Sequence, residues 1–458
     1  MRMYDQGFVL ELTKKLRINE TNLVYPSPEE VIQKMGILEE KHPEVVTSQT
    51  IGHSREGKAI KALIIGQDDK ENIAATANCH AEEAVGTISL LVLADQLASN
   101  PFASKALETR RFLLIPQANP DGYYINQGWL QKQSPSYADF LLHSKRDLRE
   151  EDVEHGIPTE ETEGSARPES MAIAEFYRQF SAQGINYYVT LHSRDLGGGA
   201  MFLCGEQPQD QTVFDVLESV VKDNGMPMRQ EDTCGLDGFT KLRDGFYSIP
   251  TFKQMREKFL ISGHLERVKK FKLNSFEYVK MTCGTKLSLV SELPLFQVPV
   301  LDDISEIPGT TRYELKRTTL GIKKDSVIKF KQQLDSFSDL KFEGPEMNFA
   351  KSLAEWDLIN IKGDMEDIQK VKKKTALALD NTTLKIQPTL SECKLNAILL
   401  RIVRDNPEHP QYLELSKRYK EGFDKAYGEL LELLDIGTTS LKQQVRIQCG
   451  LVLAGLVI

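Results

Sequence analysis

The sequence has few of the features that mark secreted, membrane-bound or nucleic-acid-binding proteins. Its six cysteines are scattered and include no Cys-x-x-Cys pair, which argues against a disulfide framework and favours a reducing compartment. Two tryptophans and a net charge of −9 disfavour a membrane surface and a general nucleic-acid ligand. The N-terminus lacks the apolar core of a signal peptide. The longest apolar run, residues 451–458, is far shorter than the ~18 residues of a membrane span. We therefore expect a cytoplasmic protein without nucleic-acid or membrane partners.

The chain of 458 residues is long enough for two domains. Apolar runs at 73–77, 111–116, 185–191 and 288–291 alternate with helical stretches, which predicts an α/β fold with a largely parallel sheet flanked by helices. Asp325 is the expected cap of a helix that closes this domain near residue 340. Beyond it, the pattern at 397–403 and 410–434 is helical. We expect a first domain over residues 1–340 and a mainly helical C-terminal domain over residues 341–458.

The stretch from Asn78 to Glu83 carries the first candidate chemistry. His80 follows the apolar run 73–77 and precedes a helical pattern, and Glu83 lies three residues later. One helical turn directs residues at this spacing to the same point, and an imidazole with a carboxylate suits zinc. The same spacing recurs at His53 and Glu56, where a polar turn favours an exposed histidine. His80 alone would be a metal ligand or an ordinary core histidine.

Two further candidates follow apolar runs. His192 comes directly after 185–191, and Glu292 comes directly after 288–291. Taken singly, these residues would be a buried histidine and an exposed charge at the end of a strand. In a parallel sheet, however, the carboxyl ends of the strands share one edge, where ligands bind. Two histidines and one glutamate leave a fourth zinc position open, as in catalytic sites. Glu292 would then be available to accept a proton.

This order of motifs resembles the zinc carboxypeptidase family typified by carboxypeptidase A. The similarity includes the Asn-Pro-Asp-Gly turn at 119–122 and a hairpin at 51–58, and it extends over roughly residues 25–295. The resemblance implies a mixed, mostly parallel eight-stranded sheet. It also implies one zinc ion per chain, held by His80, Glu83 and His192, with Glu292 as the general base. The expected partner is a peptide or amide substrate, and nothing in the sequence indicates an oligomeric state.

The chain departs from this family where the substrate's terminal carboxylate is held. Many members have an Asn-Arg pair after Asp-x, whereas the corresponding positions here are Arg149 and Glu150, after Asp147. A glutamate would repel a carboxylate, so either the anchor is non-standard or Arg149 or Arg146 replaces it. The tyrosine that guards the pocket in the family would be Tyr278, with Tyr247 as a second candidate.

The leading hypothesis is therefore a zinc-dependent metallocarboxypeptidase that hydrolyses a terminal peptide or amide bond. One alternative is an aspartoacylase-like zinc deacylase of acylated amino acids. Another is an inactive scaffold that binds peptides. The Asn-Pro-Asp-Gly turn and the chain length favour the peptidase.

Overall fold

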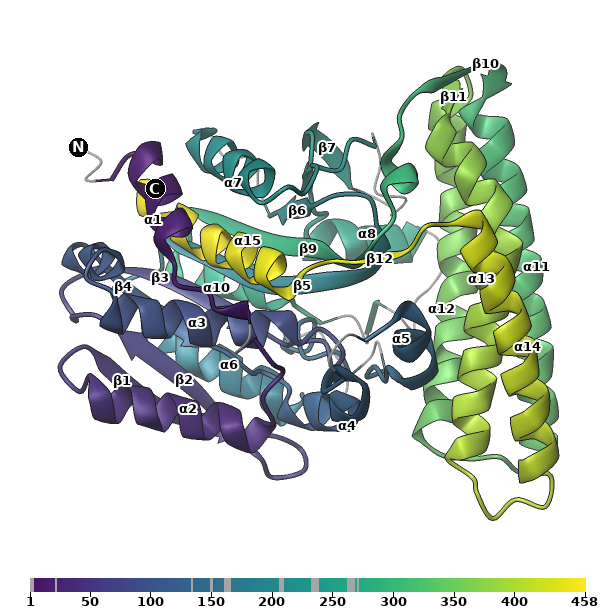
Figure 1. The fold of residues 1–458 in the computed structure, drawn as a ribbon, viewed down its shortest axis with the longest axis horizontal. Coiled ribbons are helices and arrows are strands. Elements are labelled where there is room, and N and C mark those ends of the chain that lie inside the picture. The colour runs from purple at the N-terminus through teal and green to yellow at the C-terminus, as the bar shows by residue number, and fades with distance from the viewer. Residues whose placement is uncertain are drawn as a thin grey trace.

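A computed structural model describes the fold (Figure 1). It describes residues 4–20, 23–132, 135–148, 151–159, 166–205, 210–231, 239–261, 268–269 and 272–458. Within these residues, no helix is both long enough and apolar enough to cross a membrane. The described cysteines are buried, and no disulfide joins them.

The centre of the molecule is a mixed sheet in the order β1-β2-β4-β3-β5-β9-β6-β8-β7, and β12 pairs with β9 beside this path. The strands are β1 (Val46–His53), β2 (Ala59–Ile65), β3 (Glu71–Ala77), β4 (Arg110–Ile115), β5 (Tyr187–Gly197), β6 (Met201–Cys204), β7 (Thr240–Arg243), β8 (Phe246–Ser248), β9 (Leu287–Gln297) and β12 (Gly437–Thr438). The expected mixed sheet is confirmed, but it has ten strands and not eight. Strands as short as β8 and β12 carry too few residues to show an alternating pattern.

Parallel pairing brings the candidate site together. β3 is parallel to β4 and β5, and β5 is parallel to β9, so the carboxyl ends of these strands meet at one edge. His192 lies opposite Glu292 in the β5–β9 register. Neither strand ends at these residues, contrary to expectation, because the pairing continues to Gly197 and Gln297.

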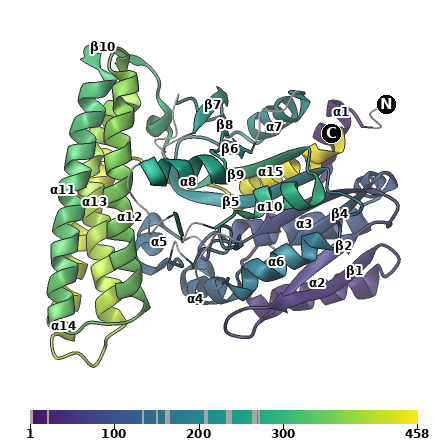
Figure 2. The same cartoon turned by 180° about the vertical axis from the view of Figure 1, so that it is seen from behind.

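Helices cover both faces of the sheet (Figures 1 and 2). One face is covered by α1 (Gln6–Lys15), α2 (Pro28–Lys41), α3 (Val85–Ser99), α7 (Thr212–Asp223) and α15 (Leu441–Leu453). The other is covered by α6 (Pro168–Arg178) and α10 (Ser275–Cys283). Residues close in sequence define the start of α2, where Ser27 and Glu30 form a reciprocal capping box and Pro28 lies in the first turn. Three more helices are α4 (Pro120–Leu130), α5 (Tyr137–His143) and α8 (Phe252–Ile261).

Four long helices stand beside the sheet as a bundle (Figure 1). They are α11 (Arg312–Asp339), α12 (Pro345–Asp367), α13 (Ala378–Arg404) and α14 (Tyr412–Leu433), with a small ribbon of β10 (Glu306–Thr311) and β11 (Thr375–Leu377) at one end. The first helix begins at Arg312 under a capping box from Thr311 and Glu314, so Asp325 lies inside it and is not its cap.

The expected boundary at residue 340 falls at the end of α11, a helix that packs against α12 and α13. After α14 the chain also returns to the sheet, because β12 pairs with β9 and α15 covers β3, β5 and β9. The bundle is therefore an insertion between β9 and β12, bounded on both sides by elements of the sheet domain.

Candidate metal centre and active-site cavity

A tight turn between β3 and α3 presents His80 and Glu83. The backbone N–H of Glu83 donates to the carbonyl of His80 at 3.2 Å, and α3 begins only at Val85. The expected helical turn is thus a turn that precedes the helix. Asn78 adopts φ 55°, and its side-chain amide donates to the His80 carbonyl at 2.9 Å. Asparagine tolerates this left-handed conformation because its short polar side chain can bond locally.

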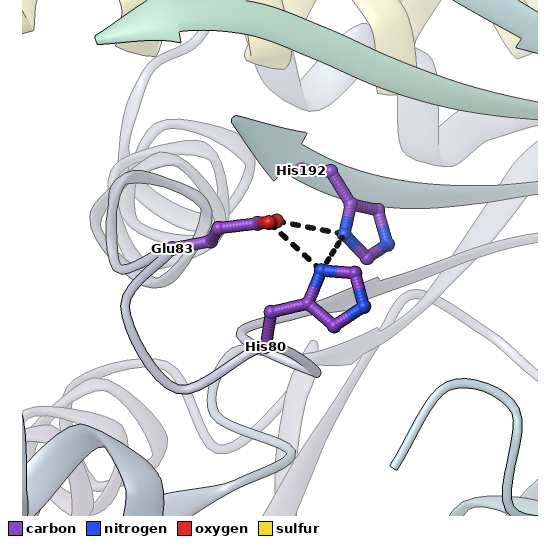
Figure 3. A group of neighbouring side chains, drawn as sticks. All are labelled: His80, Glu83 and His192. Carbon is purple, nitrogen blue, oxygen red and sulfur yellow. Dashed lines mark hydrogen bonds and ion pairs between the residues drawn. The ribbon is translucent and has the colours of Figure 1, made fainter. Parts of the chain in front are cut away.

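The structure brings His80, Glu83 and His192 together (Figure 3). Glu83 bridges the two rings: Oε1 lies 2.8 Å from His80 Nδ1 and Oε2 lies 2.8 Å from His192 Nδ1. The two Nδ1 atoms are 3.1 Å apart. Two imidazole nitrogens and a carboxylate facing one point are the donor set of a catalytic zinc site. These residues therefore fit the metal that the sequence predicts.

Two carboxylates lie behind the histidine rings, and the sequence prediction missed both. His80 Nε2 is 3.1 Å from Asp152 Oδ2, and His192 Nε2 is 3.7 Å from Glu154 Oε2. Glu154 Oε1 also accepts a hydrogen bond from Ser275 at 2.6 Å. Carboxylates in this position orient a ligating ring and raise its basicity. They lie in a polar segment without periodicity, so no local pattern marked them.

These charges shift the pKa values of the cluster. Burial and Arg146 lower the pKa of His80, but Glu83 and Asp152 outweigh them and raise it to about 9. Burial opposes the charged form of His192 too, yet Glu83 and Glu154 raise its pKa. Burial raises the pKa of Glu83, but the two histidines lower it further and hold it well below its usual range. Without a metal, the histidines are therefore the protonated partners of a carboxylate.

Glu292 stands apart from this network. Its carboxylate makes no hydrogen bond or ion pair with any other described residue, although Glu292 lies opposite His192 in the sheet. Burial and the nearby charge of Glu83 raise the pKa of Glu292 to about 7. An uncommitted carboxylate with a pKa near neutrality has the properties of a general base.

A cavity of about 600 Å³ opens over these residues. The sheet domain contributes His80, Glu83, Arg146, Arg194 and Glu292 to its wall. The bundle forms the opposite wall with mainly apolar side chains, among them Val327, Phe330, Leu353, Leu390 and Ile398. A substrate at the candidate metal centre would therefore contact both parts of the molecule.

Of the predicted substrate-binding residues that the structure describes, Arg146 lines the cavity and Tyr278 does not. Arg146 lines the cavity and forms an ion pair with Glu82 at 3.2 Å. Arg149 and Glu150 lie outside the described residues. Tyr278 is on α10 and packs against an apolar cluster that contains Ile157, Ala174 and Leu273; it is not among the described residues that line the cavity.

Tyr247 and Asp147 form contacts that hold the sheet domain together. Tyr247 is buried, and its hydroxyl donates to the carbonyl of Glu231 at 2.6 Å. Asp147 accepts from Asn119 at 2.5 Å and pairs with Arg167 at 2.8 Å. Asp147 does not contact His80; the carboxylate that does so is Asp152, five residues further along the chain.

Comparison with known proteins agrees with this geometry. Residues 31–245 match the family model for zinc carboxypeptidase. Carboxypeptidase A2 of Mus musculus is 31% identical over 127 residues, which is 26% of this chain and 30% of that protein. The inactive metallocarboxypeptidase ECM14 of Saccharomyces cerevisiae is 33% identical over 99 residues, which is 19% of this chain and 23% of that protein. These matches thus span less than a third of either relative.

Among solved structures, carboxypeptidase A from Helicoverpa armigera aligns with a TM-score of 0.40 and 16% identity, covering 81% of this chain and 80% of that one. The residues that match the family model include His80, Glu83 and His192. Over residues 31–245, the chain is thus similar to the zinc carboxypeptidase family.

Proposed function

We propose that this protein is a zinc-dependent metallocarboxypeptidase that hydrolyses a terminal peptide or amide bond. One zinc ion per chain would be held by His80, Glu83 and His192. The observation that carries the proposal is the convergence of these three donors on one point, beside the uncommitted carboxylate of Glu292. A purely structural zinc site would have a closed ligand shell, usually with thiolates.

Each residue then has a defined task. Bound zinc would polarise the scissile carbonyl and make water a better nucleophile near neutral pH. Glu292 accepts the proton of the attacking water and delivers it to the leaving amine. Asp152 and Glu154 place negative charge beside the Nε2 atoms of the two imidazole rings, which raises the basicity of the rings. The bundle limits the access of solvent to the cavity.

The carboxylate anchor is proposed to be non-standard. If Glu150 occupies the position of the usual arginine, the two like charges disfavour an ordinary C-terminal carboxylate by about 4 kcal/mol at ~4 Å and an effective dielectric constant near 20. We then expect weak activity on simple C-terminal peptides and a gain of activity in Glu150→Arg. Efficient cleavage by the wild type with no gain in the variant would show that Glu150 is elsewhere.

Two other functions use the same residues. An aspartoacylase-like deacylase would act on acylated amino acids, and an inactive scaffold would bind peptides without cleaving them. A cavity shared between the sheet domain and the bundle favours a substrate larger than a single acylated amino acid. The cytoplasmic location remains a prediction.

The decisive experiment compares wild type with Glu292→Gln, both loaded with zinc, on a panel of peptides and N-acylated amino acids. We expect both proteins to contain one zinc ion, and the variant to lose turnover by roughly 10²–10⁴-fold because it lacks the base. Similar turnover in both would refute the role of Glu292. Release of acyl groups alone would favour the deacylase, and binding without release would favour the scaffold.

A further inference from the structure

Arg194 lies at the junction of two cavities. It follows His192 by two residues on β5, so its side chain leaves the sheet on the same face as the metal ligand. It lines the active-site cavity and also a second cavity of about 660 Å³ between the sheet domain and the bundle. Both cavities share Asp195, Lys323, Gln387, Leu390 and Lys394 as well. A substrate that occupies both cavities would therefore come within reach of Arg194.

Three consecutive glycines, Gly197 to Gly199, lie at the end of β5 and directly after it, and the first and last of them contact the Arg194 side chain. Arg194 Nη2 donates to the carbonyl of Gly199 at 2.7 Å. A Cβ atom on Gly197 would lie 2.2 Å from Nη2 and 2.4 Å from Cζ of Arg194. A Cβ atom on Gly199 would lie 2.5 Å from the carbonyl oxygen of Pro227. The absence of a side chain at Gly197 therefore leaves room for the guanidinium of Arg194.

The cationic residues of the active-site cavity differ in their partners. Four of them have a carboxylate within 4.0 Å: Arg146 with Glu82 at 3.2 Å, Lys323 with Asp357 at 3.8 Å, Lys394 with Asp195 at 3.0 Å and Arg401 with Glu346 at 3.0 Å. Arg194 alone among the described cations of this wall has no ion pair with a described residue. Its neighbour Asp195 is already engaged by Lys394.

We propose that Arg194 binds a carboxylate group of the substrate. The inference rests on the proposed peptidase function and names a property of its substrate, namely a carboxylate within reach of the scissile bond. Two sources present this chemistry: the terminal carboxylate of the leaving residue, and an acidic side chain elsewhere in the peptide. The planar guanidinium suits either, because it can donate two parallel hydrogen bonds to one carboxylate.

The test measures binding and turnover separately in the full-length, zinc-loaded protein. Three N-acetylated tripeptides serve as probes: one of neutral residues with a free terminal carboxylate, its terminal amide, and a terminal amide that contains one glutamate. Dissociation constants are measured by calorimetry in Glu292→Gln protein, with and without Arg194→Gln. Hydrolysis is measured with Glu292 intact. Arg178→Gln, on the exposed surface of α6, is the matched control.

Loss of Arg194 should weaken the binding of a carboxylate-bearing probe by about 10- to 100-fold, the range expected for hydrogen bonds to a charged group. The neutral amide and the Arg178→Gln protein should be unaffected. A loss confined to the free acid identifies the terminal carboxylate, and a loss confined to the glutamate probe identifies the side chain. Equal affinities with and without Arg194, or equal losses for all three probes, would overturn the proposal.

One further variant and the hydrolysis assay separate this proposal from the proposed peptidase function. Arg194→Lys retains the charge without the planar fork, so it should bind carboxylate probes with an intermediate affinity, and it decides the question if Arg194→Gln does not fold. Arg194-dependent binding without any hydrolysis would refute the peptidase function and retain the carboxylate site. Hydrolysis that is independent of Arg194 would support the peptidase function and refute the carboxylate site.

Discussion

Glu83 contacts both histidines of the candidate centre, with one carboxylate oxygen on each ring. Its buried charge is therefore balanced by the same side chains that would share a metal with it. Removing one ring leaves a buried carboxylate with one partner fewer, which is costly in an interior. Replacing either histidine should therefore affect both metal binding and the stability of the buried Glu83 charge.

We predict that His80→Ala abolishes zinc binding, because a site with only one histidine and one glutamate has too few donors. The matched control is His53→Ala. His53 belongs to the other His-x-x-Glu match, is exposed at the end of β1, and pairs in the sheet with Ala59. Elemental analysis of the purified proteins gives the answer. Equal zinc contents in the two variants would show that His80 is not a ligand.

Zinc binding should also depend steeply on pH. The pKa of His80 is raised to about 9 by Glu83 and Asp152, against the lowering effects of burial and Arg146. At neutral pH the metal must therefore displace a proton from this ring. Below pH 9, we expect the apparent affinity to fall by about tenfold per pH unit for each displaced proton. Competition with a chelator between pH 6 and pH 9 measures this slope, and an affinity independent of pH would contradict it.

At the scale of elements, α15 packs behind β5, the strand that carries the candidate ligand His192. The side chain of Gln448 is fully buried. Its Oε1 accepts from Ser89 on α3 at 2.7 Å, and its Nε2 donates to the carbonyl of His192 at 3.2 Å. Ser291 on β9 also bonds to the backbone of His192. One side chain of the last helix thus links α3 to the strand that carries a ligand.

Gln448→Leu should lower the free energy of unfolding by about 1–3 kcal/mol, because it leaves buried polar groups without a partner. It should also weaken zinc binding, since the His192 backbone loses a support. Lys442→Gln, at a partly exposed position on the same helix that pairs with Glu20 at 3.3 Å, should cost less than about 1 kcal/mol. Chemical denaturation of both variants makes the comparison. A smaller loss for Gln448→Leu than for Lys442→Gln would argue against this support.

At the scale of the whole molecule, the bundle and the sheet domain interlock along the chain. Gly437 on β12 is the cross-strand partner of Gln297 on β9, so the chain leaves the sheet for the bundle and returns to the same place. The residues of α15 that follow are buried against the sheet. A cut at residue 340 would therefore remove more than the helical part.

Truncation after residue 340 should give an insoluble or unstable protein, because it strips α15 from an apolar face of the sheet. A second deletion tests this reason. Replacing residues 299–435 with a short turn joins β9 to β12 as a hairpin and retains α15. We expect this protein to be more soluble than the truncated one and to retain zinc. Equal solubility of the two would show that α15 is not the cause.

Much of the site follows from local pattern. His80, His192 and Glu292 each come after an apolar run, and such runs form neighbouring parallel strands whose ends meet. Asn119 caps α4 as expected, with its side chain accepting from the N–H of Gly122. Gly122 lies within the helix and has no positive φ. A Cβ atom there would lie 2.6 Å from that of Ala81, and only the packed structure reveals this close approach.

The sequence by itself indicated the class of sheet, the candidate triad of His80, Glu83 and His192 and the candidate base Glu292, because burial and capping act over a few residues and leave a readable pattern. Tertiary structure alone decided the partners Asp152 and Glu154, the lack of an ion pair between Arg194 and any other described residue, and the positions of the bundle and α15. Gln448 and His192, for example, are 256 residues apart in the chain. Contacts at such separations depend on how whole elements pack, and no periodicity within one segment encodes them.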